Sequence, residues 1–171
     1  MRKYLTLFII LVIFCCFRAL GQSSGNNYLA QPNLKKFEGK WQFSNDTITL
    51  TLQLYKEKVH INRGNNNFYI DLVQGKYSLI KKGKVISDLN SQDVTITSGS
   101  LENQNDPYTL HFIFTDVGKY SKRCNVTFKL SPNQLGKAEW LLTNTEHVIV
   151  GDEKFDLTFS VPTSMILKKV L

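Results

Sequence analysis

The sequence predicts an all-β fold, an antiparallel meander of about eight to ten strands that closes into a barrel or, as the alternative, packs as a two-sheet sandwich. Apolar and polar residues alternate with a period of two in many short segments. Turn-forming residues separate these segments about every dozen residues, and no stretch has the periodicity of a long helix. A sheet with one apolar face must cover it, and either architecture does so.

The first 21 residues have the features of an export signal. Arg2 and Lys3 supply the positive start, and residues 4–17 form an apolar run interrupted by one threonine. Small residues at 19 and 21 are those that a signal peptidase recognises. We therefore expect cleavage before Gln22.

The apolar run is also the place where a membrane anchor would lie. A spanning helix needs ~20 apolar residues, whereas this run is shorter and Arg18 ends it. We expect no stable membrane insertion after signal cleavage, with a retained anchor as the alternative. The location expected from the signal is the periplasm, the cell surface or the extracellular space.

Removing the signal leaves 150 residues, enough for one domain with a sizeable core. We expect a flexible lead-in over residues 22–33 and one β domain over residues 34–171. Three basic residues leave with the signal, so the net charge falls from +7 to +4. The one longer basic cluster, residues 81–84, has the composition of a hairpin turn. We therefore expect no nucleic-acid partner.

Within the β domain, a short helical turn is expected from Asn33 to Phe37, because Leu34 and Phe37 are three residues apart. Alternating strands follow it along the chain. Their expected apolar faces are Ile48, Leu50, Leu52 and Leu54; Phe68, Ile70 and Leu72; Val94 and Ile96; Leu110, Phe112 and Phe114; Cys124, Val126, Phe128 and Leu130; Leu157, Phe159 and Val161; and Met165 and Leu167.

The start of the domain, residues 37–41, has the pattern Phe-x-Gly-x-Trp and resembles the first strand of the lipocalins and related calycin-type barrels. The resemblance implies a lipocalin-like barrel whose base is closed by the helical turn. It also implies structural roles for Gly39 and for Trp41, which would pack across the base under a basic side chain of the last strand, Lys168 or Lys169.

Over most of residues 34–170 the chain is similar to an uncharacterised family of small secreted proteins from Bacteroidota. The similarity includes a signal that ends before Gln, the Phe-x-Gly-x-Trp start and a Thr-rich second strand. A Trp-x-Leu strand at residues 140–142 and a Val-Pro-Thr-x-Met segment at residues 161–165 complete it. This resemblance implies a fold and export, and it implies no activity.

The sequence contains no local arrangement typical of catalysis or metal binding. His60, His111 and His147 are far apart in the chain, so none forms a local ligand pair. Cys124 remains after signal removal and lies in phase with apolar residues, as expected for a buried hydrophobe. No phosphate-binding loop or nucleophile elbow is present. We expect no enzymatic activity, no metal and no cofactor.

Aromatic residues on the apolar faces provide the remaining indication of function. The candidate ligand-binding residues are Phe68, Phe112, Phe128 and Trp140. In a barrel such residues line the interior, which is either filled as a core or hollow around a small apolar ligand. The alternative function is a cell-envelope interaction or structural domain that recognises a protein or glycan with its outer face, where Tyr55, Tyr69 and Tyr108 are expected to be exposed.

Overall fold

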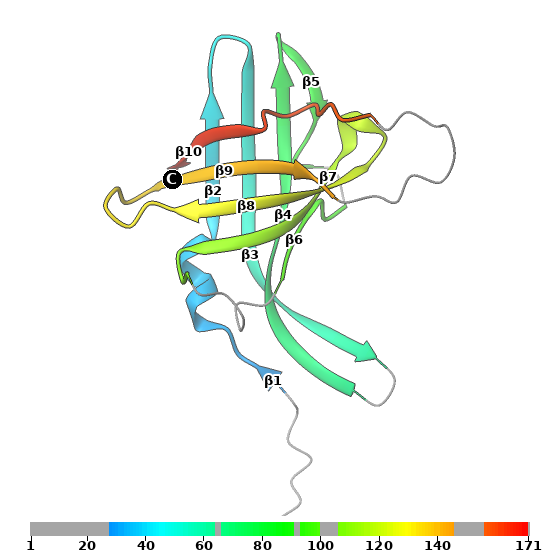
Figure 1. Cartoon of the computed structure of the whole chain (residues 1–171), viewed down its shortest axis with the longest axis vertical. Helices are drawn as coiled ribbons and strands as arrows, with labels where there is room; N and C mark the ends of the chain where they lie inside the picture. Colours follow the sequence, from blue (N-terminus) through cyan, green and yellow to red (C-terminus); the bar gives the residue numbers. More distant parts are fainter. Residues whose placement is uncertain (1–27, 64–65, 91–92, 100–105, 146–155, 171) are drawn as a thin grey trace, which may run out of the picture.

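The computed structural model describes residues 28–63, 66–90, 93–99, 106–145 and 156–170, and it has the predicted all-β class (Figure 1). The predicted signal, residues 1–21, lies outside the described residues. The strands are β1 (Tyr28–Leu29), β2 (Gly39–Ser44), β3 (Ile48–Arg63), β4 (Asn66–Lys81), β5 (Lys84–Ser87), β6 (Ile96–Ser98), β7 (Thr109–Asp116), β8 (Lys122–Leu130), β9 (Lys137–Asn144) and β10 (Ser164–Val170). The 3-10 helices are η1 (Pro32–Phe37) and η2 (Val117–Lys119).

Eight of these strands close into an antiparallel barrel, which confirms the predicted architecture. Their order is β4-β3-β2-β10-β9-β8-β7-β6, and β6 pairs back onto β4. The strands β1 and β5 are additions that both pair with β4. We call the end that carries η1 the base and the end that carries η2 the rim.

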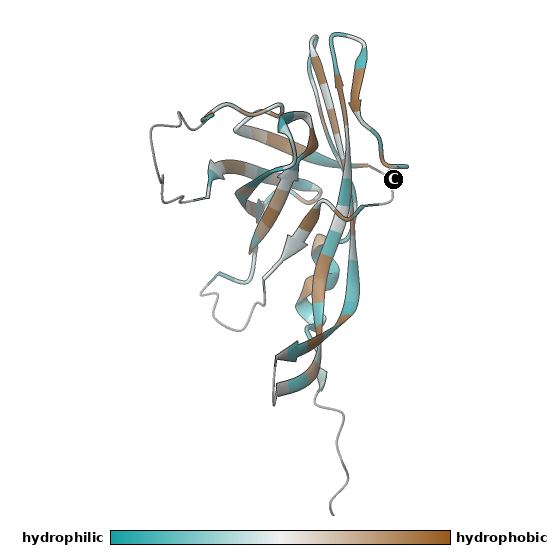
Figure 2. Ribbon diagram, turned by 90° about the vertical axis from the view of Figure 1, so that its right-hand side faces the viewer, coloured by the Kyte–Doolittle hydropathy of each residue, from teal (hydrophilic) through white to brown (hydrophobic). Residues whose placement is uncertain are grey.

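The strands β3 and β4 are much longer than their neighbours and project past the base as a two-stranded arm (Figures 1 and 2). Pairing between β2 and β3 ends at Leu54, and β6 pairs with β4 at Gln74 and Gly75. Residues 55–63 and 66–72 therefore extend beyond the barrel. We define the arm as residues 55–63 of β3 and 66–72 of β4.

The predicted alternation is confirmed in most strands of the barrel. Interior residues of β3, β7, β8 and β10 are buried at the expected positions, and η1 forms with Leu34 and Phe37 fully buried. The buried core side chains at predicted apolar positions are Leu50, Leu52, Leu54, Ile96, Leu110, Phe112, Phe114, Cys124, Val126, Phe128, Leu130, Val161, Met165 and Leu167. They form one continuous apolar core inside the barrel.

The interior face predicted for β4 is wrong. Even-numbered residues of β3 pair with odd-numbered residues of β4, so Val73, Tyr77 and Leu79 face the core. Phe68 and Leu72 lie on the opposite face and are half-buried. The arm has apolar residues on this second face and a buried aspartate on the first. In the sequence, these apolar residues alternate with polar ones, so the pattern predicts the face that carries Phe68 and Leu72 as the interior face.

The structure corrects one further expectation. Residues 157–161, predicted as a strand, form an irregular segment that leads into β10, and Leu157 is exposed. Residues 28–33, at the end of the predicted lead-in, contain β1 and the start of η1. In both segments, hydrogen bonds to aspartate side chains hold the backbone, and sequence alternation does not record such contacts.

Closure of the barrel requires a close approach of backbones at Gly75. A Cβ atom added there would lie 2.6 Å from the Gln53 carbonyl oxygen and 2.6 Å from a Leu54 methyl carbon. Gly75 also accepts a hydrogen bond from the Thr95 N–H, at 3.0 Å, just before β6 begins. Because glycine has no side chain, β4 can lie against β3 and receive β6 at the same residue.

We therefore expect Gly75→Ala to lower the free energy of unfolding by about 1–3 kcal/mol, because the new methyl group overpacks against backbone. Gly99→Ala is the matched control, since a Cβ there meets no atom within 4 Å. Urea unfolding monitored by circular dichroism measures both variants. Equal midpoints for the two would contradict this account of closure.

Candidate functional site

The structure places three of the four candidate ligand-binding residues in the core. Phe112, Phe128 and Trp140 are each at most 2% exposed. The ring centroids of Phe112 and Phe128 are 5.6 Å apart, and Trp140 meets Phe114 edge-to-face at 5.4 Å. These are the distances of packed aromatic pairs. Phe68 lies elsewhere, on the arm, so the four residues do not form one site.

Other candidate chemical groups also lie apart. His60 is on the arm, His111 is exposed on the outer face of β7, and His147 lies outside the described residues. Burial raises the pKa of the Cys124 thiol to about 11, which keeps it protonated and unreactive at neutral pH. In the described ranges, no three His, Cys, Asp or Glu side chains are close enough to hold a metal ion.

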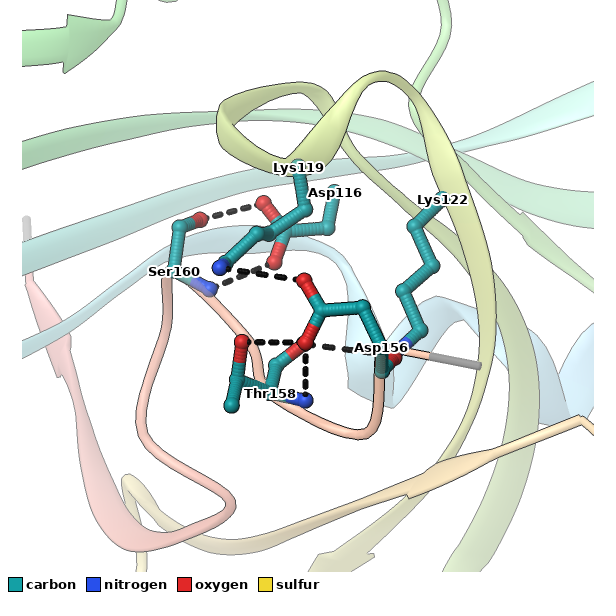
Figure 3. Close-up of polar contacts among 6 residues, drawn as sticks. All are labelled: Asp116, Lys119, Lys122, Asp156, Thr158 and Ser160. Atoms are coloured by element: carbon teal, nitrogen blue, oxygen red, sulfur yellow. Dashed lines mark hydrogen bonds and ion pairs between the residues drawn. The ribbon is translucent and has the colours of Figure 1, made fainter. Parts of the chain in front are cut away.

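At the rim, a polar cluster holds the segment before β10 against the turn between β7 and β8 (Figure 3). Asp116 is fully buried at the end of β7 and accepts hydrogen bonds from the Ser160 hydroxyl and from the Ser160 N–H, the latter at 2.7 Å. The Tyr77 hydroxyl accepts from the Val117 N–H at 3.0 Å. Burial raises the pKa of Tyr77 to about 12, so this phenol stays neutral.

The outer part of this cluster is an exposed aspartate with several donors (Figure 3). The hydroxyl and N–H of Thr158 lie 2.6 and 2.8 Å from one Asp156 oxygen, and the Lys119 ammonium lies 3.2 Å from the other. The Thr158 hydroxyl, followed by its N–H and by Lys119, lowers the pKa of Asp156 to about 2. The cluster holds the segment before β10 across the rim.

At the base, Trp41 has the position that the lipocalin resemblance implies. Its indole N–H donates to the Phe37 carbonyl at 2.9 Å, and its ring meets Phe128 edge-to-face at 5.2 Å. Lys169 of β10, rather than Lys168, lies over the ring, with its ammonium 5.3 Å from the centroid. Lys168 pairs with Gln42 in the sheet and is exposed.

Gly39 is part of the same arrangement. Its φ angle is +119°, and a Cβ there would lie 2.7 Å from the Cε of Lys169. Glycine at this position therefore gives the Lys169 side chain room to cross Trp41. In the Gly-x-Trp motif, the glycine therefore leaves space for the Lys169 side chain, and the tryptophan provides the ring that this side chain covers.

Lys169 also forms part of a surface pocket of about 460 Å³ outside the base. Its lining comes from η1, β2, the residue just before β7, the end of β8 with the turn that follows it, the start of β9 and the end of β10. The residues that give the pocket its character are Lys36, Lys137, Lys169, Trp41, Tyr108 and Leu135. We call it the base pocket. Its volume lies within the range of small-molecule sites, ~300–1,000 Å³.

The charge of the base pocket is one-sided. Three of its lining residues are lysines, and none of the lining residues that the structure describes is a carboxylate. Among the described residues, Lys36, Lys137 and Lys169 form no salt bridge. The Lys36 ammonium instead lies 4.6 Å from the centroid of the half-exposed Tyr108 ring. Leu135, fully exposed on the turn, supplies an apolar edge.

The sequence analysis did not identify Lys36 or Lys137 as site residues. Each is an ordinary surface lysine in the sequence, and the two are brought together only by barrel closure. Tyr108 was expected to be exposed, and its side chain is 42% exposed. The signal in the sequence that could have pointed to this pocket is the presence of Tyr108 and Leu135 in turns, where polar residues are more common.

On the arm, Asp71 holds the N-terminal segment in place. Its carboxylate accepts hydrogen bonds from the Tyr28 hydroxyl at 2.7 Å and the Gln31 N–H at 3.0 Å, and pairs with Lys56 at 3.0 Å. Burial alone would raise its pKa, but these three donors outweigh burial and lower it. Lys58 adds a cation–π contact on both sides, 4.5 Å from the Tyr28 centroid and 4.6 Å from that of Tyr69.

The fold and these sites define a closed antiparallel β-barrel with an aromatic core, a fastened rim and a basic pocket outside its base. The chain belongs to a protein family of unknown function, DUF6705, whose model matches residues 1–170. No curated protein and no solved structure matches the chain. Within the part of the chain that the structure describes, no helix is long and apolar enough to cross a membrane.

The rim cluster predicts the effect of removing one hydroxyl. Ser160→Ala leaves the buried Asp116 carboxylate without its hydroxyl donor, so we expect the free energy of unfolding to fall by about 1–3 kcal/mol. Ser164→Ala on the exposed side of β10 should change it by less than about 0.5 kcal/mol. Urea unfolding compares the two variants. An unchanged midpoint for Ser160→Ala would show that this contact does not hold the rim.

The Asp71 contacts predict a pH dependence. The folded-state pKa lies below the unfolded value of ~3.9, so the stabilisation is present above that pH and is lost as the pH falls through the folded pKa. We expect Asp71→Asn to be less stable than the parent protein by about 1–3 kcal/mol at pH 7, with the difference shrinking below pH ~4. Urea unfolding at several pH values measures this, and a difference that persists undiminished at low pH would contradict it.

Proposed function

We propose that this protein is an exported, non-catalytic recognition domain that binds its target on the outside of the barrel base. The observation that supports the proposal most directly is the packing of the interior. The rings of Phe37, Trp41 and Phe112 each contact the ring of Phe128, at centroid distances of 5.2 to 6.3 Å. An eight-stranded barrel is just wide enough for side chains to fill it or to hold one small ligand. A ligand in the part of the interior that these rings occupy would have to displace them.

The base is the favoured surface because it combines a pocket, exposed aromatic residues and excess positive charge. The base pocket lies outside the core, so occupying it requires no change in the barrel. The arm extends from the same end and presents Tyr28 and Tyr69, with Lys58 between them. Surface aromatic groups combined with basic side chains are typical of recognition surfaces.

The second candidate function is binding of a small apolar ligand inside the barrel, as the aromatic strand faces predicted. One observation favours it. The indole N–H of Trp140 is buried and has no hydrogen-bond partner among the described atoms. A ligand oxygen at this position would satisfy that donor. Against it stands the edge-to-face contact of the Trp140 ring with Phe114, which occupies the space beside the indole.

Retinol separates the two candidates, because it is a neutral apolar molecule whose fluorescence rises in a dry cavity. On titration into the folded protein we expect no saturable rise, because the rings packed around Phe128 occupy the interior there. Amide NMR spectra recorded in parallel should show no change at Phe112 or Trp140. Stoichiometric retinol binding with shifts at these residues would overturn the proposal and establish the interior site.

A further inference from the structure

We infer that the base pocket binds a small amphipathic anion, a carboxylate or phosphate monoester that carries an apolar tail. This inference rests on the proposed function, because it assigns a ligand class to the surface named there. The pocket belongs to the outer side of the base, so it is separate from the barrel interior.

The positive charge of the pocket defines one half of the ligand. Lys36 comes from η1, Lys137 from the start of β9 and Lys169 from the end of β10, so lysines from three elements line one pocket. Among the described residues no carboxylate lines the pocket or forms a salt bridge with these lysines. A concave site of one charge focuses the electric field and favours an anion. Lysine binds phosphate and carboxylate as a point charge, so either head group fits.

The apolar surfaces define the other half. Trp41 forms part of the pocket wall beneath Lys169, and Tyr108 lies beneath the Lys36 ammonium. Leu135 lines the edge of the pocket and is fully exposed, so its apolar side chain is available to a ligand. An apolar tail lying against Tyr108 and Leu135 would remove both from water while its head group meets the lysines.

The backbone around the pocket is fixed before any ligand arrives. The Lys169 N–H donates to the Gly136 carbonyl at 2.7 Å, and the Ser131 N–H donates to the Lys137 carbonyl at 3.0 Å. Gly136 adopts a φ of +79°, which lets the turn between β8 and β9 fold back against β10. These bonds hold the lysine-bearing segments together, so little ordering entropy is lost on binding.

The test titrates the purified protein with octanoate, octyl phosphate and octanol, three molecules with the same tail and different heads. Isothermal titration calorimetry gives affinities, and amide NMR shifts locate the site. We expect both anions to bind with shifts at Gly136, Lys137 and Lys169, and octanol to bind roughly tenfold more weakly or not at all. Raising the salt from about 20 to about 200 mM should weaken anion binding, because the lysines are at the surface.

Matched variants assign the charge effect. Lys36→Gln with Lys137→Gln should weaken binding of both anions roughly tenfold. Lys81→Gln with Lys84→Gln changes the net charge equally, at the turn between β4 and β5, and should have less than about a twofold effect. Leu135→Ser should weaken octanoate binding without changing the melting temperature, since this side chain packs on nothing. Circular dichroism confirms that each variant is folded.

Vesicles distinguish the possible sources of the anion. Binding of octyl anions without sedimentation on phosphatidylglycerol vesicles identifies a free ligand, and sedimentation that the Lys36/Lys137 variant loses identifies a lipid head group. Either result supports the inference. Failure of both, or octanol binding as tightly as octanoate, overturns it. If neither octyl anion binds and retinol also does not bind, the inferred ligand class is wrong, but the proposal of recognition on the outer surface is not contradicted.

Discussion

The structure depends on the approach of β4 to two neighbours at once. At Gly75 the strand leaves the arm, lies against β3 and receives β6, and only a residue without a side chain can do this at the observed spacing. When β6 pairs with β4, the eight strands close into a barrel, and the side chains on their inner face pack together as the core. The positions of the base and the rim depend on this pairing.

A closed barrel of eight strands still has two ends, and this protein covers both. Leu34 and Phe37 of η1 are fully buried at the base beside Trp41. At the rim, Asp116 fastens the segment that contains Ser160, and Val161 of that segment is buried. The arm and the base pocket lie at the same end of the barrel, so the two surfaces proposed for recognition are on one side of the molecule.

The sequence predicted what period-two alternation encodes. Strands such as residues 124–130 have one apolar face and one polar face, and their orientation followed directly. The prediction failed where a buried aspartate breaks the alternation of apolar and polar residues. Asp71 is buried through its hydrogen bonds, so the inner face of β4 is the opposite of the one predicted. Asp116 accepts the Ser160 N–H and holds an irregular segment where a strand was predicted. The base pocket could not be predicted, because Lys36 and Lys137 meet only through closure of the sheet.

Lys169 connects the stability of the barrel to its surface chemistry. Its alkyl chain crosses the place where a Gly39 side chain would be, its ammonium lies over Trp41, and the same ammonium lines the base pocket. Replacing it would disturb the base and the pocket together, so its effect on binding could not be separated from packing. Among the described residues, Lys36 and Lys137 have no such contact with Trp41, so replacing them leaves the packing of Lys169 over Trp41 in place. An anion bound there would in turn neutralise positive charge beside Lys169 and hold that side chain across Trp41, so ligand binding should stabilise the base of the barrel.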